Sequence, residues 1–299
     1  MQRDYPRLDI YEFGEHLLDS GDLDPVYIAL DRADWDTEGR LARWLLAYWC
    51  FYHCGVASWL SEQRDFWGAM GVATRNEAPA PNGGRWSRGS ERRHFRGHAA
   101  VNAVLELERR FPEPESVARW IAHEYSANGD TIKFALDSGQ LAFASVAERA
   151  KSLPLFGPWI SFKIADMLDR LGLVSIDFDK AAVFMFDDPV KAALMLWRRV
   201  EGLPDSAQPK SAAAREQIID SVVAHLTEHF KDRSAPPLYE RPVGLQEVET
   251  ILCKWKSHVN GHYPLYNDID EIRRGLEAWT GHSQTARALL YAMPEPEGE

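Results

Sequence analysis

The 299-residue sequence predicts an all-α protein, and three observations support this fold class. Apolar residues recur every three or four positions through most of the chain, which places them along one face of a helix. No segment shows the sustained two-residue alternation that a half-buried strand requires. Clusters of glycine and proline, as at 79–84 and 234–243, fall between the helical segments. We therefore expect only scattered extended turns besides the helices.

Length and composition predict one large domain or two small ones with a well-packed core. Hydrophobic residues make up 45% of the chain, and 11 residues are tryptophan. The longest apolar run, from Trp44 to Leu60, is interrupted by polar residues and glycine, so we expect no membrane-spanning helix. The N-terminus shows no secretory signal pattern.

The three cysteines form neither a disulfide framework nor a Cys-x-x-Cys pair, which favours a reducing cytoplasm as the compartment. Cys50 and Cys54 lie one helical turn apart with His53 between them, but we favour buried helical cysteines over a metal site. The formal net charge of −11 argues against a nonspecific nucleic-acid binder, although a local basic cleft remains compatible with it. The sequence contains no dinucleotide-binding glycine motif, Walker loop, deaminase motif or nucleophile elbow.

The first third of the chain is helical up to a loop at 73–84. Residues 1–40 have a helical pattern that breaks at Gly21 and Pro25. Residues 37–61 are apolar nearly all round, which predicts one long buried helix. A further helix is predicted over residues 60–70.

A run of arginines follows the loop, with five arginines and one glutamate from position 85 to 96. Ser90 can cap a helix starting at Glu91, which would place Arg92 and Arg96 on one face. Arginine binds phosphate oxygens through two parallel hydrogen bonds, so we favour an anion site over a solvated face paired with surplus carboxylates. The candidate ligands are Arg85, Arg88, Arg92, Arg93 and Arg96.

Helices are predicted over 99–111, 114–127 and 141–151, with a turn at 128–130. A tight turn then leads into a helix that is predicted to begin at Pro158. Proline is favoured at the first position of a helix, because the N–H group that it lacks would have no partner within the helix there. This helix has an apolar face and stops at Gly172. The pattern is typical of a helix-hairpin-helix, in which Gly157 and the helix N-terminus turn backbone N–H groups toward a phosphate. Asp177 follows 20 residues after Gly157.

The last third contains helices over 189–200, 212–231, 246–260 and 268–279. Residues 202–211 form a linker, residues 234–243 form a proline-rich loop, and residues 284–299 are expected to be a flexible tail. On the 246–260 helix, Lys254 and His258 share a face and can point into one cleft, and Lys256 lies close by. Lysines on helices are usually only solvated, so the functional hypothesis for these residues stays open beside the structural one.

Residues 142–177 resemble the helix-hairpin-helix DNA glycosylase superfamily, where a Leu-Pro-Gly-x-Gly turn clamps the DNA backbone and an aspartate one helix later is catalytic. Asp177 occupies that place, whereas Leu155 stands where the first glycine of the family turn would be. A hairpin that needs a positive φ at this point would be strained by leucine. The resemblance implies one glycosylase-like helical unit over residues 1–299, or two lobes about a DNA cleft.

Three stretches together resemble one narrower family, over residues 40–280. They are the arginine run, the hairpin with Asp177, and the Cys-Lys-Trp-Lys run at 253–256 with the residues that follow it. The family is that of the α-glutamyl/putrescinyl thymine pyrophosphorylases, or amino acid:DNA transferases, of phages with hypermodified DNA. These enzymes displace pyrophosphate from the 5-methylene carbon of pyrophosphorylated 5-hydroxymethyluracil in DNA with an amino acid or polyamine.

The resemblance implies a phage-encoded transferase in the host cytoplasm, with the amine as co-substrate and no certain cofactor or metal. The arginine run would stabilise the leaving pyrophosphate, and Asp177 would act as general base. Lys163, Lys254 and His258 join Asp177 as candidate catalytic residues, and we expect them and Lys256 to bind DNA phosphates, the leaving group or the amino acid carboxylate. An extruded thymine could stack on Trp86, Phe95 or Trp159.

Two alternatives stay open at the level of sequence. The first is a DNA glycosylase that excises a modified or damaged base, in which Asp177 would activate water. The second is a noncatalytic DNA-binding or inhibitory phage protein, which the acidic net charge favours.

Overall fold

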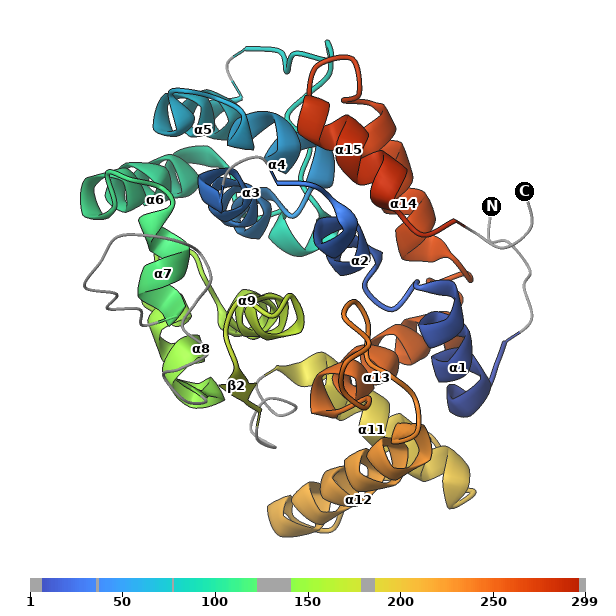
Figure 1. The fold of residues 1–299 in the computed structure, drawn as a ribbon. Coiled ribbons are helices and arrows are strands. Elements are labelled where there is room, and N and C mark those ends of the chain that lie inside the picture. Colours follow the sequence, from blue (N-terminus) through green and yellow to red (C-terminus); the bar gives the residue numbers. More distant parts are fainter. Residues whose placement is uncertain (1–6, 36–37, 77, 123–140, 179–185, 296–299) are drawn as a thin grey trace. The chain divides into compact units, whose positions relative to one another are not determined.

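A computed structural model describes residues 7–35, 38–76, 78–122, 141–178 and 186–295. The prediction of an all-α fold is confirmed, because helices account for nearly all the regular structure in these ranges (Figure 1). The chain divides into two compact units. Unit 1 comprises Met1–Pro25, Phe178–Ile269 and Pro294–Glu299, and unit 2 comprises Val26–Asp177 and Asp270–Met293. None of the helices in the described ranges is both long and apolar enough to cross a membrane.

Unit 2 begins with helices that bury most of the tryptophan-rich segment. They are α2 (Pro25–Arg32, whose first residue belongs to unit 1), α3 (Glu38–Phe51), α4 (Cys54–Ser61) and α5 (Phe66–Arg75). The single helix predicted over 37–61 is wrong, because the chain breaks between α3 and α4 at Tyr52, which has a φ of 49°. The Nδ1 atom of His53 then accepts a hydrogen bond from the N–H of Val56 and caps α4. Local capping chemistry thus overrides a continuous apolar pattern.

The arginine run connects α5 to α6 (Gly97–Arg110), which is followed by α7 (Ser116–Ala122). The helix predicted to start at Glu91 is wrong. Residues Ser90–Arg92 form only the short 3-10 helix η1, and the chain turns again at Gly97, whose φ is 68°. Arg92 and Arg96 therefore do not share a helix face. The predicted turn at 128–130 lies outside the described residues.

The hairpin lies between α8 (Phe143–Lys151) and α9 (Pro158–Arg170), which pack against each other. Two short parallel strands, β1 (Leu141–Ala142) and β2 (Ile176–Asp177), pair before α8 and after α9. Pro158 occupies the first turn of α9 as predicted, and the helix ends just before Gly172, whose φ is 66°. The predicted apolar face of α9 is buried.

Helices α14 (Asn267–Glu277) and α15 (Gln284–Ala292) follow at the C-terminal end of the chain. The flexible tail predicted over 284–299 is wrong for its first nine residues, because these form α15. Ala286 and Leu289 of α15 are buried, and the helix packs on α4 within unit 2. Ser283 caps α15 by accepting the N–H of Ala286.

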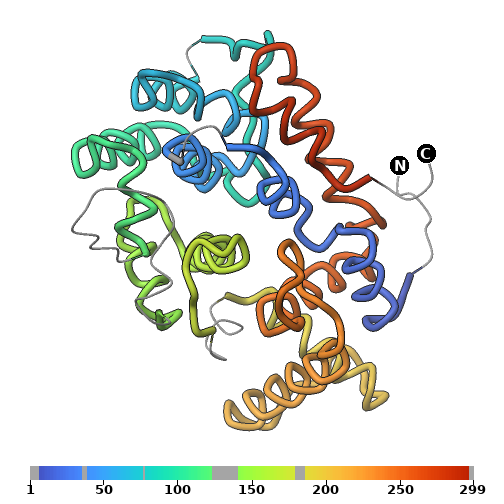
Figure 2. Tube along the Cα trace, in the orientation of Figure 1, coloured from blue at the N-terminus to red at the C-terminus, as the bar shows by residue number. Residues whose placement is uncertain are grey.

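Unit 1 contains α1 (Ile10–Ser20), α11 (Asp187–Val200), α12 (Ala212–Phe230) and α13 (Leu245–Val259). Helix α13 packs against α1 and α11. Figure 2 shows the backbone trace of these three helices. The apolar residues that recur at helical spacing along α13 are all buried: Val248, Ile251, Leu252, Trp255 and Val259. Asp9 caps α1, and Gly21 ends it with a φ of 74°.

Candidate functional site

The turn between α8 and α9 presents backbone donors at its surface. Gly157 is the N-cap of α9, and no side chain caps this end of the helix. The N–H groups of Trp159 and Ile160 make no hydrogen bond to any described residue. A Cβ atom added to Gly157 would meet nothing within 4 Å, so the space in front of the turn is open. Free N–H groups at a helix N-terminus form an anion site.

Asp177 is the last residue of β2 and is exposed. Its backbone is fixed by the pairing of Ala142 with Asp177, and by the carboxylate of Asp169, which accepts the N–H of Ile176 at 2.8 Å. The Asp177 carboxylate itself makes no hydrogen bond or ion pair with a described residue. A rigid backbone and a free carboxylate suit a group that must accept a proton from a substrate.

Two of the five arginines in the run are turned inward. Arg88 donates only to backbone carbonyl oxygens: those of Phe95, Trp86, Ala73 and Thr74. It thereby satisfies carbonyl groups at the end of α5. Arg92 is 7% exposed and donates to the carbonyl oxygens of Cys50 and Leu155. Burial lowers the pKa of both guanidinium groups.

The other three arginines, Arg85, Arg93 and Arg96, are exposed. Within the described ranges none of them forms an ion pair with a carboxylate. Arg93 makes one hydrogen bond, from Nη1 to the carbonyl oxygen of Ser90 at 3.0 Å. These three therefore form the solvated part of the structural alternative without its carboxylate pairing in the described ranges, and the anion site stays a prediction.

Of the three aromatic residues predicted to stack on an extruded base, only Trp159 has an exposed surface. Trp86 and Phe95 are 3% and 1% exposed and belong to the core. Trp159 is half-buried beside the open turn, and its ring meets the ring of Tyr52 edge-on with centroids 4.9 Å apart.

Lys163 lies on α9 but is buried, which the sequence did not predict. Its Nζ atom is 3.2 Å from Oδ2 of Asp166, and the same oxygen accepts the hydroxyl of Tyr27 at 2.8 Å. Arg170 lies 3.8 Å from the other carboxylate oxygen. Asp166 is thus buried between two cations, and its Oδ1 atom makes no hydrogen bond with a described residue.

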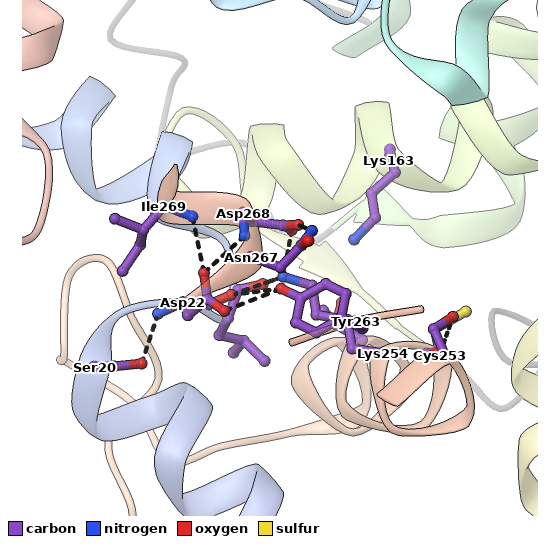
Figure 3. A network of polar contacts seen from close by, with 12 residues as sticks. Ser20, Asp22, Lys163, Cys253, Lys254, Tyr263, Asn267, Asp268 and Ile269 are labelled. Carbon is purple, nitrogen blue, oxygen red and sulfur yellow. Dashed lines mark hydrogen bonds and ion pairs between the residues drawn. The ribbon is translucent and has the colours of Figure 1, made fainter. Parts of the chain in front are cut away.

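Lys254 belongs to a polar network inside unit 1 that Figure 3 shows in close-up. Its Nζ atom donates to the carbonyl oxygens of Asp22 (2.7 Å) and Leu23, and it pairs with Oδ2 of Asp268 at 2.7 Å. All three ammonium hydrogens thus have acceptors. In the free protein Lys254 joins the segment after α1 to the start of α14.

Asp22 is the centre of this network and is fully buried. Its Oδ1 atom accepts the backbone N–H groups of Asp268 and Ile269 at 3.1 and 2.9 Å, and Oδ2 accepts the hydroxyl of Tyr263 at 3.2 Å. Burial raises the pKa of Asp22 to about 7, although the ammonium of Lys254 opposes this rise. Asp22 therefore caps α14 as a carboxylate whose charge is costly.

His258 and Lys256 also have partners within unit 1. His258 is buried and stacks on Phe13 with ring centroids 4.5 Å apart. Its Nε2 accepts the N–H of Leu8 at 3.0 Å, so Nδ1 carries the proton and donates to the carbonyl oxygen of Tyr263 at 2.8 Å. Burial lowers the pKa of His258. Lys256 pairs with Asp188 at the start of α11.

The structure therefore separates the predicted site residues into two groups. Gly157, Asp177 and the exposed arginines present free donors or acceptors, whereas the remaining candidates are held by contacts inside the protein: Arg88, Arg92, Lys163, Lys254, Lys256 and His258. Lys254 and His258 do share one face of α13, but it faces a buried network rather than an open cleft. Sequence analysis missed the buried acidic residues Asp22 and Asp166, because no local pattern distinguishes them from solvated carboxylates.

Comparison with known proteins agrees with the resemblance found in the sequence. The profile of the family described as "Amino acid:DNA transferase" matches residues 18–263. A glycinyltransferase of Pseudomonas phage PaMx11 is 48% identical over 305 aligned positions, which cover 99% of both chains. A putrescinyltransferase of Delftia phage PhiW-14 is 23% identical over 296 positions, covering 94% of this chain and 82% of the relative. The chain therefore belongs to the amino acid:DNA transferase family and is a transferase.

Proposed function

We propose that this transferase joins glycine, or another small amine, to the 5-methylene carbon of pyrophosphorylated 5-hydroxymethyluracil in DNA and releases pyrophosphate. Two features of unit 2 support the proposal. The backbone N–H groups at the start of α9 have no hydrogen-bond partner among the described residues and can bind an anion, and the carboxylate of Asp177 after this helix is exposed and has no partner among them. Glycine is the first candidate because the phage relative that is 48% identical is a glycinyltransferase. The host cytoplasm, where phage DNA is modified, is the proposed site of action.

Asp177 would generate the nucleophile. An amino acid enters with its amine protonated and cannot attack carbon until one proton has left. The Asp177 carboxylate takes that proton, the nitrogen lone pair forms the C–N bond, and the C–O bond to pyrophosphate breaks with its electron pair on the leaving oxygen. The exposed position of Asp177 and its rigid strand suit this role.

The leaving pyrophosphate requires positive charge that is present before the bond breaks. Arg85, Arg93 and Arg96 are the members of the run with free donors, and they carry this proposal. Arg88 and Arg92 already donate to backbone carbonyl oxygens, so they would have to give up internal hydrogen bonds to bind the leaving group. The amides at the start of α9 are proposed to hold a phosphate of the DNA backbone.

The direct catalytic roles predicted for Lys163, Lys254 and His258 stay predictions. Their contacts in the free protein favour positioning of α9, α13 and α14 over contact with the substrate. An extruded thymine is proposed to stack on Trp159, since enzymes acting on a base must remove it from the duplex stack.

The proposal is tested by incubating pyrophosphorylated DNA with the protein and separate amines: glycine, other amino acids and putrescine. Mass spectrometry of the released nucleosides should show a thymidine adduct of the added amine, with one inorganic pyrophosphate formed per adduct. The Asp177→Asn variant should bind the same DNA and form neither product.

Two results would contradict the proposal and identify the alternatives. Abasic sites without an adduct, detected as strand breaks after alkali, would indicate a glycosylase. DNA binding with neither an adduct nor pyrophosphate, for every amine tried, would indicate a noncatalytic DNA-binding protein.

A further inference from the structure

Leu155 adopts an unfavourable backbone conformation at the hairpin turn. Its φ is 64°, in the left-handed region that glycine occupies without strain. Leu155 is 42% exposed, so burial of this leucine contributes little to holding the turn. Some other contact must therefore stabilise the conformation of Leu155.

Arg92 supplies that contact. Its Nη1 atom donates to the carbonyl oxygen of Leu155 at 2.9 Å, and its Nε atom donates to the carbonyl oxygen of Cys50 at 3.2 Å. One guanidinium thus joins the hairpin turn to α3. The group also lies over the rings of Phe95 and Phe156, each 5.1 Å from its centre, which fixes its plane.

The same geometry argues against a ligand role for Arg92. The side chain is 7% exposed, and its third nitrogen, Nη2, is buried without a hydrogen-bond partner among the described residues. A phosphate in solvent cannot reach this nitrogen unless the turn moves. The guanidinium therefore acts on the turn from inside the protein.

We propose that Arg92 is a positioning residue that holds the hairpin turn, through the carbonyl group of Leu155, in the conformation that binds DNA. The inference rests on the proposed function, in which this turn grips a DNA phosphate. Arg92 thereby replaces the intrinsic freedom of the glycine that the family turn has at this point.

The test combines Arg92→Met, Leu155→Gly, and the double variant. Arg88→Met is the matched control, since Arg88 also donates only to carbonyl oxygens and lies 5.1 Å from a ring centre, that of Phe51, but does not contact the hairpin. Hydrogen exchange of the amides at 153–160 is measured in the free protein. DNA affinity and the single-turnover rate at saturating DNA are measured separately.

Arg92→Met should speed amide exchange in the turn and weaken DNA binding by about 5- to 30-fold. This factor corresponds to the energetic cost of holding one non-glycine residue in the left-handed conformation. The rate at saturating DNA should change much less than the affinity. Leu155→Gly should improve the affinity of the Arg92→Met protein while leaving that of the unmodified protein similar or slightly weaker, because glycine adopts the turn without help. Arg88→Met should lower the melting temperature and leave exchange in the turn unchanged.

Three results would overturn the inference. The first is a fall of about 100-fold or more in the single-turnover rate of Arg92→Met at saturating DNA, as for a lost leaving-group donor. The others are a double variant that binds DNA no better than Arg92→Met, and equal effects of Arg88→Met and Arg92→Met on amide exchange in the turn. If the unmodified protein bound no DNA, the proposed function would fail instead, and the exchange measurements would still decide whether Arg92 holds the turn.

Discussion

Replacing Lys254 with methionine should separate a structural from a catalytic role for this residue. Methionine fills a similar volume but cannot donate to the carbonyl oxygens of Asp22 and Leu23 or pair with Asp268. The Lys254 side chain is 12% exposed and that of Asp268 is 31% exposed. We therefore expect the free energy of unfolding to fall by about 3 kcal/mol, the low end for breaking a buried ion pair, because water partly screens Asp268.

Lys256→Met is the matched control on the same helix. Lys256 pairs with Asp188, whose side chain is 56% exposed, so its loss should cost no more than about 1 kcal/mol. Urea denaturation followed by circular dichroism measures both variants. The transfer rate is then compared under conditions in which each variant is folded.

The pH dependence follows from Asp22. Its pKa is about 7 in the folded protein against an ordinary value of 3.8, so the folded state binds the proton more tightly. The contribution of Asp22 to stability is thus fully present below about pH 4 and is lost as the pH rises to about 7. The ammonium of Lys254 lowers the pKa of Asp22, so replacing Lys254 raises that pKa. The stability contributed by Asp22 then continues to fall at higher pH than in the unmodified protein. The stability difference between Lys254→Met and the unmodified protein should therefore be larger at about pH 8 than at about pH 5.

The structural account of Lys254 would be refuted by a Lys254→Met protein that is as stable as Lys256→Met at both pH values but transfers no amine. That result would place the Lys254 ammonium at the substrate, as the sequence-based hypothesis expected.

Three further predictions concern unit 2. Asp177→Asn should abolish transfer, leave DNA affinity within a few-fold, and change the free energy of unfolding by less than about 0.5 kcal/mol because the carboxylate is exposed and unpartnered, as rapid-quench kinetics and urea denaturation would show. Single replacement of Arg93 or Arg96 by alanine should lower transfer or, if the residue contacts only the DNA backbone, reduce the salt dependence of binding by about one counterion, which a salt titration measures. Gly55→Ala should lower the free energy of unfolding by about 1–3 kcal/mol, since a Cβ at this position would lie 2.4 Å from the carbonyl oxygen of Gly275 and 2.2 Å from Trp279. An unchanged midpoint of urea denaturation would show that α4 and α14 can move apart without cost.

The sequence predicts best those features that are set within a few residues. Pro158 at the start of α9 and the glycines at the ends of α1 and α9 follow from backbone restrictions that neighbours in the sequence impose. The hairpin pattern also points to the positive φ of Leu155, but the contact that holds this residue comes from Arg92, which no local pattern predicts. The break at Tyr52 was missed because the apolar pattern continues across it and only a histidine cap reveals the new helix.

Features that join distant parts of the chain could not be predicted. Asp22 accepts hydrogen bonds from Asp268 and Ile269, about 246 positions further along the chain. A solvated carboxylate and a buried helix cap look alike in sequence. The buried Lys163 shows the same limit, since nothing in the local sequence shows that it and its partner Asp166 are both buried.

The arginine run shows why charge in a sequence does not identify a ligand site by itself. Arg92 and Arg93 are neighbours, yet Arg92 turns inward to the hairpin carbonyl of Leu155 and Arg93 is exposed. Arg92 is the last residue of the short helix η1, and Arg93 is its C-cap. Arg85, Arg93 and Arg96 are exposed and have no carboxylate partner in the described ranges, so water solvates their charges in the free protein. Stabilisation of the leaving pyrophosphate should therefore depend on these exposed arginines rather than on the two that hold the fold.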